Sequence, residues 1–211
     1  MRHTRTVNNA EPLASLLHER GDLVVDRLFT GDLPPDALMT NLELEGCTLQ
    51  VCRWQGRQMT GATFAECEFV DCDLSGTALA GVTFRECSFR GTKALGLDWT
   101  AASVSTLAAV PMTWRDCTLD FAAMVGVTMA GWGFRDCSMR ETHVEGSDLR
   151  RATFVDCDFS GASIAECDLR GATMTDCVGV VFDPRSNRVD GLEVSASMAA
   201  NLLSPLGITV R

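Results

Sequence analysis

Ten cysteines and three histidines are the side chains of this sequence best suited to nucleophilic or metal chemistry. Thiolates and imidazoles bind zinc when they converge, commonly as two cysteines two to four residues apart with further ligands nearby. Here the closest cysteines are five residues apart, and the histidines (His3, His18 and His143) are widely separated. We therefore expect no metal site, and we expect buried thiols that act as small hydrophobic side chains.

Groups for other kinds of catalysis are equally few. Lys93 is the only lysine and tyrosine is absent. The sequence contains no G-x-S-x-G, no P-loop, no G-x-G-x-x-G and no H-E-x-x-H. We expect a protein that is not an enzyme, with no cofactor and no small-molecule substrate; an enzyme is the least favoured alternative.

Carboxylates recur with a fixed spacing. Four aspartates occupy every twentieth position, each directly before a cysteine: Asp116, Asp136, Asp156 and Asp176. Three further acidic candidates lie between them: Asp148, Asp158 and Asp168. Stacked at the ~4.8 Å spacing of β-strands, one such column approaches the ~3.4 Å spacing of phosphates along a DNA strand. The pattern predicts an acidic face for a basic protein partner. The alternative is that each aspartate caps a turn by accepting backbone N–H groups, which is compatible with an exposed acidic face.

Composition supports a soluble protein and restricts its partners. The 211 residues carry a formal net charge of −10, which disfavours binding to nucleic acid or to an anionic membrane because both would repel the chain. The N-terminal segment, residues 1–20, contains no apolar stretch of signal-peptide length, and no run approaches the ~20 apolar residues of a membrane span. We expect a cytoplasmic protein that binds neither membrane nor nucleic acid.

The segments that position these residues repeat every five residues. From Leu44 to Met174 every fifth residue is apolar. The residue two before it is usually Cys, Ala, Thr, Val or Ser, and Gly often follows two after it. Larger residues at the small position include Arg57, Leu97, Leu107, Met112 and Trp132.

This period predicts a coil. Residues two apart in an extended chain face the same side, so the small and the large residue both point inward. The next small residue lies three further on, and the chain must turn every five residues to keep it inside. A chain that turns identically in this way winds into a β-solenoid. The recurrence of aspartate at every twentieth position favours four sides per coil, with between six and seven coils over residues 44–178, a column ~32 Å tall.

End segments bracket the column of residues 44–180. Residues 1–43 are predicted to form an N-terminal cap, with a short helix over residues 12–20 and a strand from Val24 to Phe29. Residues 181–211 are predicted to form a loop, a helix over residues 193–204 and a last strand at 208–210. Their apolar residues occupy more than one helix face and are the predicted dimer interface: Val194, Met198, Leu202, Leu203, Leu206 and Ile208. The alternative is that they only cover the last coil.

Segments such as DLRRATFVDCDFSGASIAECDLRGA (residues 148–172) resemble the pentapeptide repeat family, whose pattern is A(D/N)LxX. The resemblance covers about residues 44–178. It implies a right-handed quadrilateral β-helix, which agrees with the coil derived from the period and adds its handedness.

Two further segments, KALGLDWT (residues 93–100) and NLLSPLGI (residues 201–208), resemble the topoisomerase-protecting subgroup of that family. This subgroup includes the Qnr quinolone-resistance proteins and the albicidin and microcin immunity proteins. The resemblance implies a cytoplasmic homodimer, joined at its C-terminal end, that mimics DNA, binds DNA gyrase and protects it from an inhibitor. Topoisomerase IV is a further candidate partner.

The sequence departs from Qnr in lacking an evident register-breaking loop between coils, which favours the immunity-type proteins. The weak repeats from Ala101 to Met112 are the place where a small bulge would fit. The alternative function is a scaffold or regulatory protein that binds a different protein partner.

Overall fold

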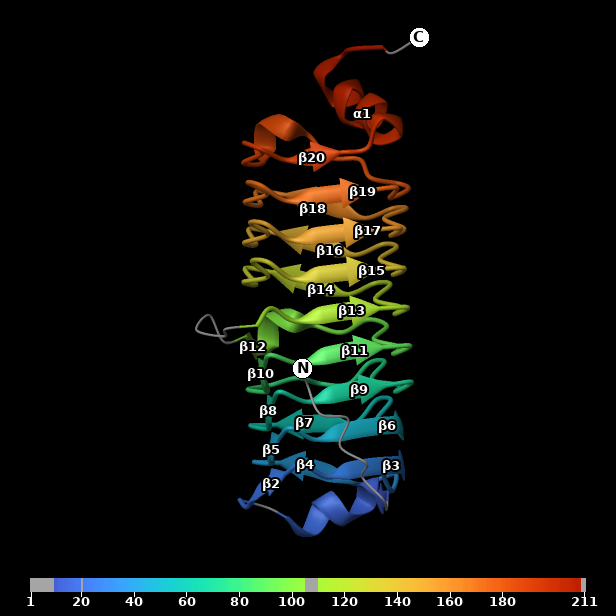
Figure 1. Ribbon diagram of the computed structural model, residues 1–211, viewed down its shortest axis with the longest axis vertical. Helices are drawn as coiled ribbons and strands as arrows, with labels where there is room; N and C mark the ends of the chain where they lie inside the picture. Colours follow the sequence, from blue (N-terminus) through green and yellow to red (C-terminus); the bar gives the residue numbers. More distant parts are fainter. Residues whose placement is uncertain (1–9, 20, 105–109, 210–211) are drawn as a thin grey trace, which may run out of the picture.

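The computed structural model describes residues 10–19, 21–104 and 110–209. Short strands alternate with sharp corners, and the chain winds into a parallel β-solenoid of about nine turns (Figure 1). The five-residue period produces each strand, because a large buried residue such as Phe84 lies between two residues that point outward, Thr83 and Arg85. The predicted all-β solenoid with a small C-terminal helix is confirmed.

The coil has four faces, numbered here in the order in which the chain visits them. Face 1 is a parallel sheet in the order β1 (Glu11–Pro12), β3 (Leu28–Asp32), β6 (Thr48–Arg53), β9 (Glu68–Val70), β11 (Ser88–Arg90), β13 (Thr113–Arg115), β15 (Gly133–Arg135), β17 (Thr153–Val155), β19 (Thr173–Thr175) and β20 (Glu193–Val194). Face 2 is joined by single β-bridges through Arg53, Asp73, Lys93, Thr118, Ser138, Asp158 and Val178. Face 1 is turned toward the viewer in Figure 1.

Faces 3 and 4 complete each coil. Face 3 carries β4 (Leu38–Thr40), β7 (Gln58–Thr60), the 3₁₀ turn η2 (Trp99–Ala101), β14 (Ala123–Val125), β16 (His143–Glu145) and β18 (Ser163–Ala165). Face 4 carries β2 (Leu23–Val25), β5 (Glu43–Glu45), β8 (Thr63–Ala65), β10 (Thr83–Arg85) and β12 (Ser103–Val104), and single bridges continue it through Thr128, Asp148, Asp168 and Arg188. Face 4 is therefore opposite face 2.

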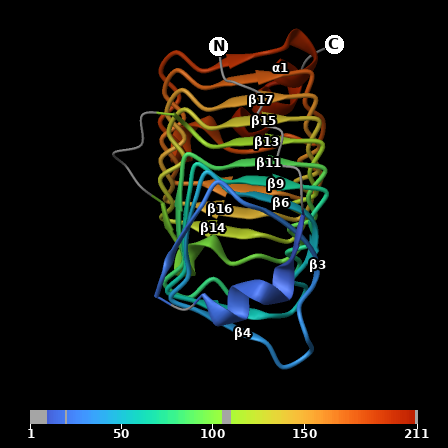
Figure 2. The same ribbon diagram turned by 60° about the horizontal axis from the view of Figure 1, so that its bottom comes forward.

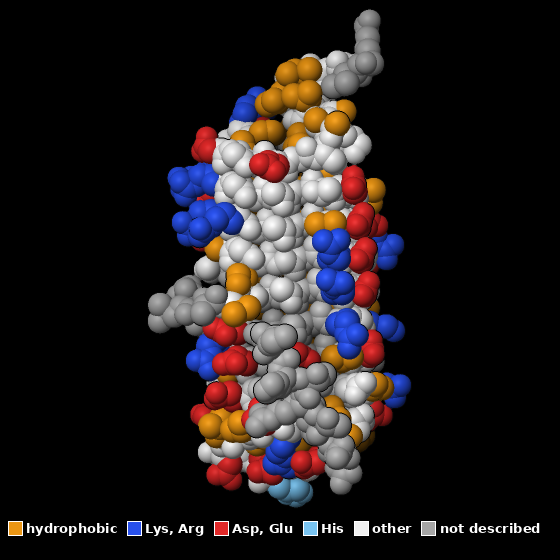
Figure 3. Space-filling model, in the orientation of Figure 1, with side chains coloured by type: hydrophobic (Ala, Val, Ile, Leu, Met, Phe, Trp, Pro, Cys, Tyr) orange, Lys and Arg blue, Asp and Glu red, His pale blue; other side chains and the backbone are white. Residues whose placement is uncertain are grey.

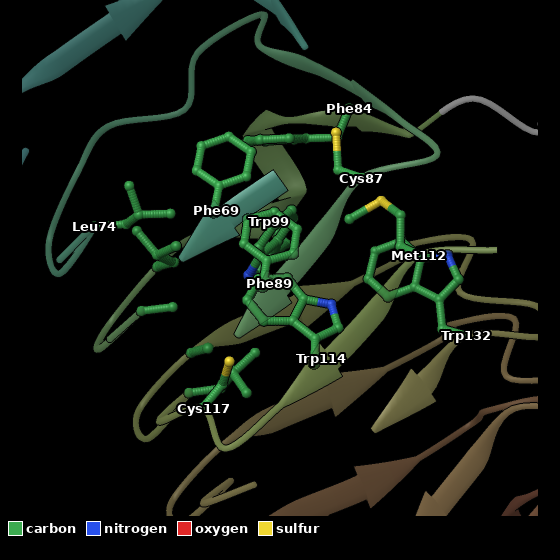
Figure 4. Close-up of a cluster of buried hydrophobic side chains, with 14 of the residues drawn as sticks. Phe69, Leu74, Phe84, Cys87, Phe89, Trp99, Met112, Trp114, Cys117 and Trp132 are labelled. Carbon is green, nitrogen blue, oxygen red and sulfur yellow. The ribbon is translucent and has the colours of Figure 1, made fainter. Parts of the chain in front are cut away.

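The predicted inward positions form the core. Every fifth residue from Leu44 to Met174 is buried, apart from Val104, which is half-buried, and Ala109, which lies outside the described residues. Behind face 1 the buried rings stack from coil to coil, with centroids 4.6 Å apart for Phe69 and Phe89 and 3.7 Å apart for Phe89 and Trp114 (Figure 4). This stack continues through Phe134 to Phe154 and stabilises the middle of the column.

One coil is longer than the others, which corrects the expectation of an uninterrupted register. Ser88 pairs with Glu68, which lies four pentapeptides before it, but with Thr113, which lies five pentapeptides after it. Thr83 still pairs with Ser103, twenty residues later, so the additional pentapeptide lies between β12 and β13. This position is within the segment from Ala101 to Met112, whose weak repeats mark the place for a small bulge. The apolar period of five conceals this insertion, since one whole repeat is added.

Large side chains at the small inward position surround the longer coil. Leu97, Met112 and Trp132 are all buried there, and Trp132 packs edge-on against Trp99 with centroids 6.2 Å apart (Figure 4). Three of the exceptions to the repeat therefore lie close to the inserted pentapeptide. Leu107 lies outside the described residues, and Arg57 is half-exposed far below.

The N-terminal end joins the solenoid earlier than residue 44, because β2, β3 and β4 pair with β5, β6 and β7. The predicted strand from Val24 to Phe29 is broken at Asp26, a corner residue with φ of 56°. The 3₁₀ helix η1 (Leu13–His18) lies across the open end of the first coil (Figure 2) and buries Leu13 and Leu16 against the core.

The C-terminal end is closed by a helix. After the 3₁₀ turn η3 (Pro184–Ser186) and β20 come α1 (Ala196–Leu203) and the 3₁₀ turn η4 (Ser204–Leu206). The predicted strand at 208–210 is not formed at Ile208 or Thr209, and Val210 lies outside the described residues. No helix within the described residues has the length and apolar character needed to cross a membrane.

Candidate protein-binding surface

The four regularly spaced aspartates form a column at the corner between faces 1 and 2. Asp116, Asp136, Asp156 and Asp176 follow β13, β15, β17 and β19, and all four are exposed. Their φ angles are 53° to 54°, the left-handed region that the corner requires. We call these residues the corner aspartates. Figure 3 shows acidic side chains gathered along the right-hand edge of the column.

Backbone hydrogen bonds hold the corner aspartates in register. The Asp116 and Asp136 N–H groups each donate 3.0 Å bonds to the carbonyls of Arg135 and Val155 in the next coil. Within the described residues, no donor bonds to their four carboxylates and no cation lies within ion-pair distance of them. The column therefore presents carboxylates to solvent at the strand spacing of ~4.8 Å.

Turn capping is performed by other aspartates, each two residues before its donor. The Asp158 carboxylate accepts the Ser160 N–H at 2.9 Å and its hydroxyl at 2.6 Å. Asp73 accepts the Ser75 N–H at 3.0 Å, and Asp98 accepts the Thr100 N–H at 3.0 Å. Asp148 and Asp168 accept the N–H groups of Arg150 and Arg170 in the same way, at 3.1 Å and 3.3 Å. The capping alternative thus describes Asp148, Asp158 and Asp168 among the predicted acidic residues, but not the corner aspartates.

Asp148 and Asp168 lie on face 4 and are ion-paired. The Arg150 guanidinium donates 2.6 Å and 2.9 Å bonds to Asp148, and the Arg170 guanidinium donates 2.7 Å and 2.8 Å bonds to Asp168. Arg188 lies a further 3.4 Å from Asp168. The hydrogen bonds from Arg170 lower the pKa of Asp168 to about 2, and those from Arg150 lower the pKa of Asp148. These residues are separated from the corner aspartates and their charge is neutralised.

A basic ladder runs beside the corner aspartates on face 1. Arg90, Arg115 and Arg135 pair with one another in register on β11, β13 and β15, and all three are exposed. Figure 3 shows these basic side chains next to the acidic column. The aspartates therefore project a negative field mainly away from the ladder, toward face 2.

Face 2 adds to this negative field. Asp158 lies on it beside the corner, and Glu141 occupies its far corner. Its Asp120 is buried and bound by Arg140, whose Nη2 lies 2.8 Å from the Asp120 carboxylate. Burial alone would raise the pKa of Asp120, but hydrogen bonds from Ser138 and Arg140 outweigh it and keep that pKa below its usual value. We call face 2 with the corner aspartates the acidic surface.

Because one coil is longer, Glu66 and Glu86 do not continue the column of corner aspartates. Gly91 and Asp71 lie beneath Asp116, as the bonds from the Gly91 and Asp71 N–H groups to the carbonyls of the next coil show. Glu66 and Glu86 lie at the corner between faces 4 and 1. A constant coil of four pentapeptides would instead have placed Asp116 above Gly96.

The predicted dimer residues divide into two groups. Met198 and Leu202 are buried within the chain's own core, and Val194 packs against it from β20. Leu203 is half-buried, Leu206 is 37% exposed and Ile208 is 49% exposed. The first group covers the last coil, as the alternative interpretation had it, while the second leaves apolar surface at the C-terminal end (Figure 3).

The ten cysteines are free and buried at the small inward position. Burial raises the pKa of the Cys87 thiol to about 12, and its Sγ lies 3.3 Å from the Phe64 carbonyl oxygen. A thiol with such a pKa is protonated at neutral pH and is a poor nucleophile or metal ligand. Within the described residues no three His, Cys, Asp or Glu side chains are grouped to hold a metal ion.

Comparison with known proteins identifies the repeat. The family described as Pentapeptide repeats matches in eight copies, over residues 58–93 and 134–176. The unmatched interval contains the longer coil. No curated protein matches the sequence.

Solved structures with the same fold have different roles. A trypsin-treated form of QnrB1, described as a plasmid-mediated fluoroquinolone resistance protein, is 20% identical over 92% of each chain, with a TM-score of 0.50. HetL from the cyanobacterium Nostoc, described as involved in heterocyst differentiation regulation, is 16% identical over 82% of this chain and 85% of its own, with a TM-score of 0.61. At these identities the likeness shows the fold alone.

Proposed function

The chain is a pentapeptide-repeat protein, and on this premise we propose that it binds DNA gyrase in place of DNA and protects the enzyme from an inhibitor. The observation that carries the proposal is the column of four exposed corner aspartates that lack a cationic partner within the described residues. A straight column of carboxylates at strand spacing offers a basic DNA-binding groove a negative edge similar to a phosphate backbone.

The charges of the acidic surface support this mode of binding. Asp158 and Glu141 extend the negative field across face 2, while the basic ladder borders it on face 1. Complementary fields accelerate association and fix the orientation of a complex. We therefore expect face 2 to face the basic groove of the partner, in the same orientation in every complex.

The protein acts by occupancy rather than by chemistry. Its ten thiols are buried, and we assign the protein no catalytic role and no cofactor. The inhibitor it counters is a poison of the gyrase–DNA complex, because a competitor of DNA reduces the amount of that complex. Topoisomerase IV, which binds DNA with a related groove, is the second candidate enzyme.

The test is DNA supercoiling by purified gyrase with increasing amounts of the chain, with and without a gyrase poison. We expect rescue from the poison at low dose and inhibition of supercoiling at high dose. Absence of both effects, with several poisons and gyrase from the native host, would contradict the proposal.

We further propose a homodimer formed through the C-terminal end. Leu206 and Ile208 are exposed there and Leu203 is half-buried, whereas Met198 and Leu202 already pack into the chain's own core. Sedimentation velocity at micromolar concentration should give a dimer for the wild type and a monomer for Leu203→Glu. A wild-type monomer would refute this arrangement; Val110→Glu, an exposed position far from the C-terminal end, is the control.

The alternative function is a scaffold or regulator that binds another protein, and the likeness to HetL favours it. That protein shares the fold and is described as involved in heterocyst differentiation regulation. A chain that leaves gyrase unaffected in the supercoiling assay would have this second function.

A further inference from the structure

Phe121 is an aromatic side chain held outside the column. It occupies the corner between faces 2 and 3 with φ of 62°, and 64% of it is exposed. Most corners carry Gly, Asp, Glu or Asn, which tolerate a positive φ, whereas a bulky side chain there is strained. The residue thus has two unfavourable features at once, a strained backbone and an exposed ring.

No neighbouring side chain along this corner, within the described residues, covers the ring. The corner residues beneath it are Gly96, Gly76 and Gly56, and a Cβ built on any of them would meet no atom within 4 Å. Above it, the Glu141 carboxylate leans away over Gly161. Phe121 therefore stands at the end of a smooth, glycine-lined edge that another molecule can approach.

The turn before Phe121 is held by hydrogen bonds to a buried carboxylate. The neighbouring Asp120 is 3% exposed, and its carboxylate accepts the Arg140 N–H at 3.0 Å, the Arg140 Nε–H at 3.0 Å and the Ser138 hydroxyl at 2.5 Å. The Phe121 N–H itself donates a 2.9 Å bond to the Arg140 carbonyl. The ring is therefore presented from a fixed backbone, which lowers the entropy lost on binding.

Charge places this ring at the border of the acidic surface. Face 2 separates Phe121 from Asp116 and Asp136, and Glu141 lies in the coil directly above it. Strained residues cluster at functional sites, and an aromatic ring that becomes buried in a complex contributes a large apolar area to binding.

We propose that Phe121 is the apolar anchor of the complex with the basic protein partner, inserting into an apolar pocket at the rim of that partner's DNA-binding groove. The inference rests on the proposed function, because gyrase is the partner to which the ring is assigned. Duplex DNA has no counterpart of this ring, so the anchor distinguishes the chain from the substrate it imitates. It also fixes the axial position of an otherwise repetitive column, since the corner carries no second aromatic residue within the described part of the chain.

Phe121→Gly separates anchoring from folding. Glycine relieves the positive φ, so we expect a melting temperature equal to or above that of the wild type. The affinity for purified gyrase, measured by surface plasmon resonance, should fall at least 10-fold through faster dissociation. Val51→Gly is the matched control, because Val51 is also an exposed corner residue with a positive φ (55°) but lies far down the column; it should keep affinity within twofold.

Three results would overturn the inference, and they can be told apart. A lower melting temperature for Phe121→Gly would show that the ring stabilises the fold. Unchanged gyrase affinity with wild-type stability would refute the anchor and leave the proposed function intact. No binding by the wild type would refute the proposed function and, with it, the assignment of Phe121 to that partner.

Discussion

The corner aspartates and the aspartates of face 4 recur with the same spacing, yet they differ in what surrounds the carboxylate. Asp136 and Asp156 are exposed with no cation in reach among the described residues, whereas Asp148 and Asp168 are bound by Arg150 and Arg170. The first pair contributes a field outside the protein. The second pair contributes stability and almost no field, so a count of acidic residues overestimates the charge available to a partner.

The difference arises from one neighbouring residue. On face 4 an arginine lies two residues after each aspartate, and this D-x-R spacing also pairs Asp183 with Arg185. On face 2 a serine follows Asp158 at that distance. The Asp158 carboxylate caps the turn by accepting the Ser160 N–H, and no cation within the described residues neutralises it there. A corner aspartate directs its side chain outward from a left-handed residue, out of reach of such a partner.

Removing the corner charges should have the largest effect. We expect Asp→Asn at all four corner aspartates to weaken gyrase binding roughly 30-fold, because each charge is expected to contribute about 0.5 kcal/mol to the binding free energy. Asparagine also tolerates a positive φ, so the thermal stability should be unchanged. Surface plasmon resonance measures the affinity and circular dichroism the stability.

The matched control compares two double variants with the same change in charge. Asp136→Asn/Asp156→Asn should lose about fivefold in affinity, while Asp148→Asn/Asp168→Asn should lose less than twofold. Equal losses would mean that only the net charge matters and that the column has no special role.

Removing a paired charge should affect stability instead. Asp168→Asn loses the hydrogen bonds from Arg170, and we expect the free energy of unfolding to fall by about 1 kcal/mol, since solvent screens part of the pair. The folded pKa of about 2 lies below the unfolded value. The contribution is therefore complete above about pH 4 and is lost as the pH falls toward 2. Urea unfolding of both proteins at pH 6 and pH 2.5 should show the difference and then its loss; a constant difference would contradict the assignment.

Converting one class of aspartate into the other should have the smallest effect. Ser160→Arg creates the D-x-R spacing on face 2, and we expect the new guanidinium to neutralise Asp158 and weaken gyrase binding about threefold. Ser160→Lys adds the same charge without the planar fork that binds a carboxylate at two points, so its loss should be smaller. The reverse order of the two variants would show that added charge alone determines the result.

Much of the fold followed from the sequence because the period of five fixes which residues face inward. The inward series and the corners were accessible in this way, and the closing helix followed from the helical spacing of Val194, Met198 and Leu202. The longer coil was not, since inserting one complete repeat leaves the apolar pattern intact. Its traces were the weak repeats from Ala101 to Met112 and the large residues at positions where small ones are the rule, Leu97, Leu107, Met112 and Trp132.

The surface was predicted less well than the core. Recurrence at every twentieth position identified the corner aspartates as a column, and the arginines beside Asp148 and Asp168 were visible in the sequence as D-x-R. Whether an arginine at that spacing binds the aspartate depends on side-chain geometry, which the sequence period does not specify. The five-residue pattern does not single out Phe121 from other residues at the corners. Only its positive φ and its exposed ring, both seen in the structure, distinguish it.

Competition with DNA tests the central claim most directly. The measurement is the affinity of the chain for purified gyrase at increasing concentrations of linear duplex DNA, with no gyrase poison in the assay. Mimicry predicts that the apparent dissociation constant rises in proportion to the DNA concentration, with the same maximal binding. An affinity that is independent of DNA would contradict the account, because the corner aspartates would then contact gyrase outside its DNA-binding groove.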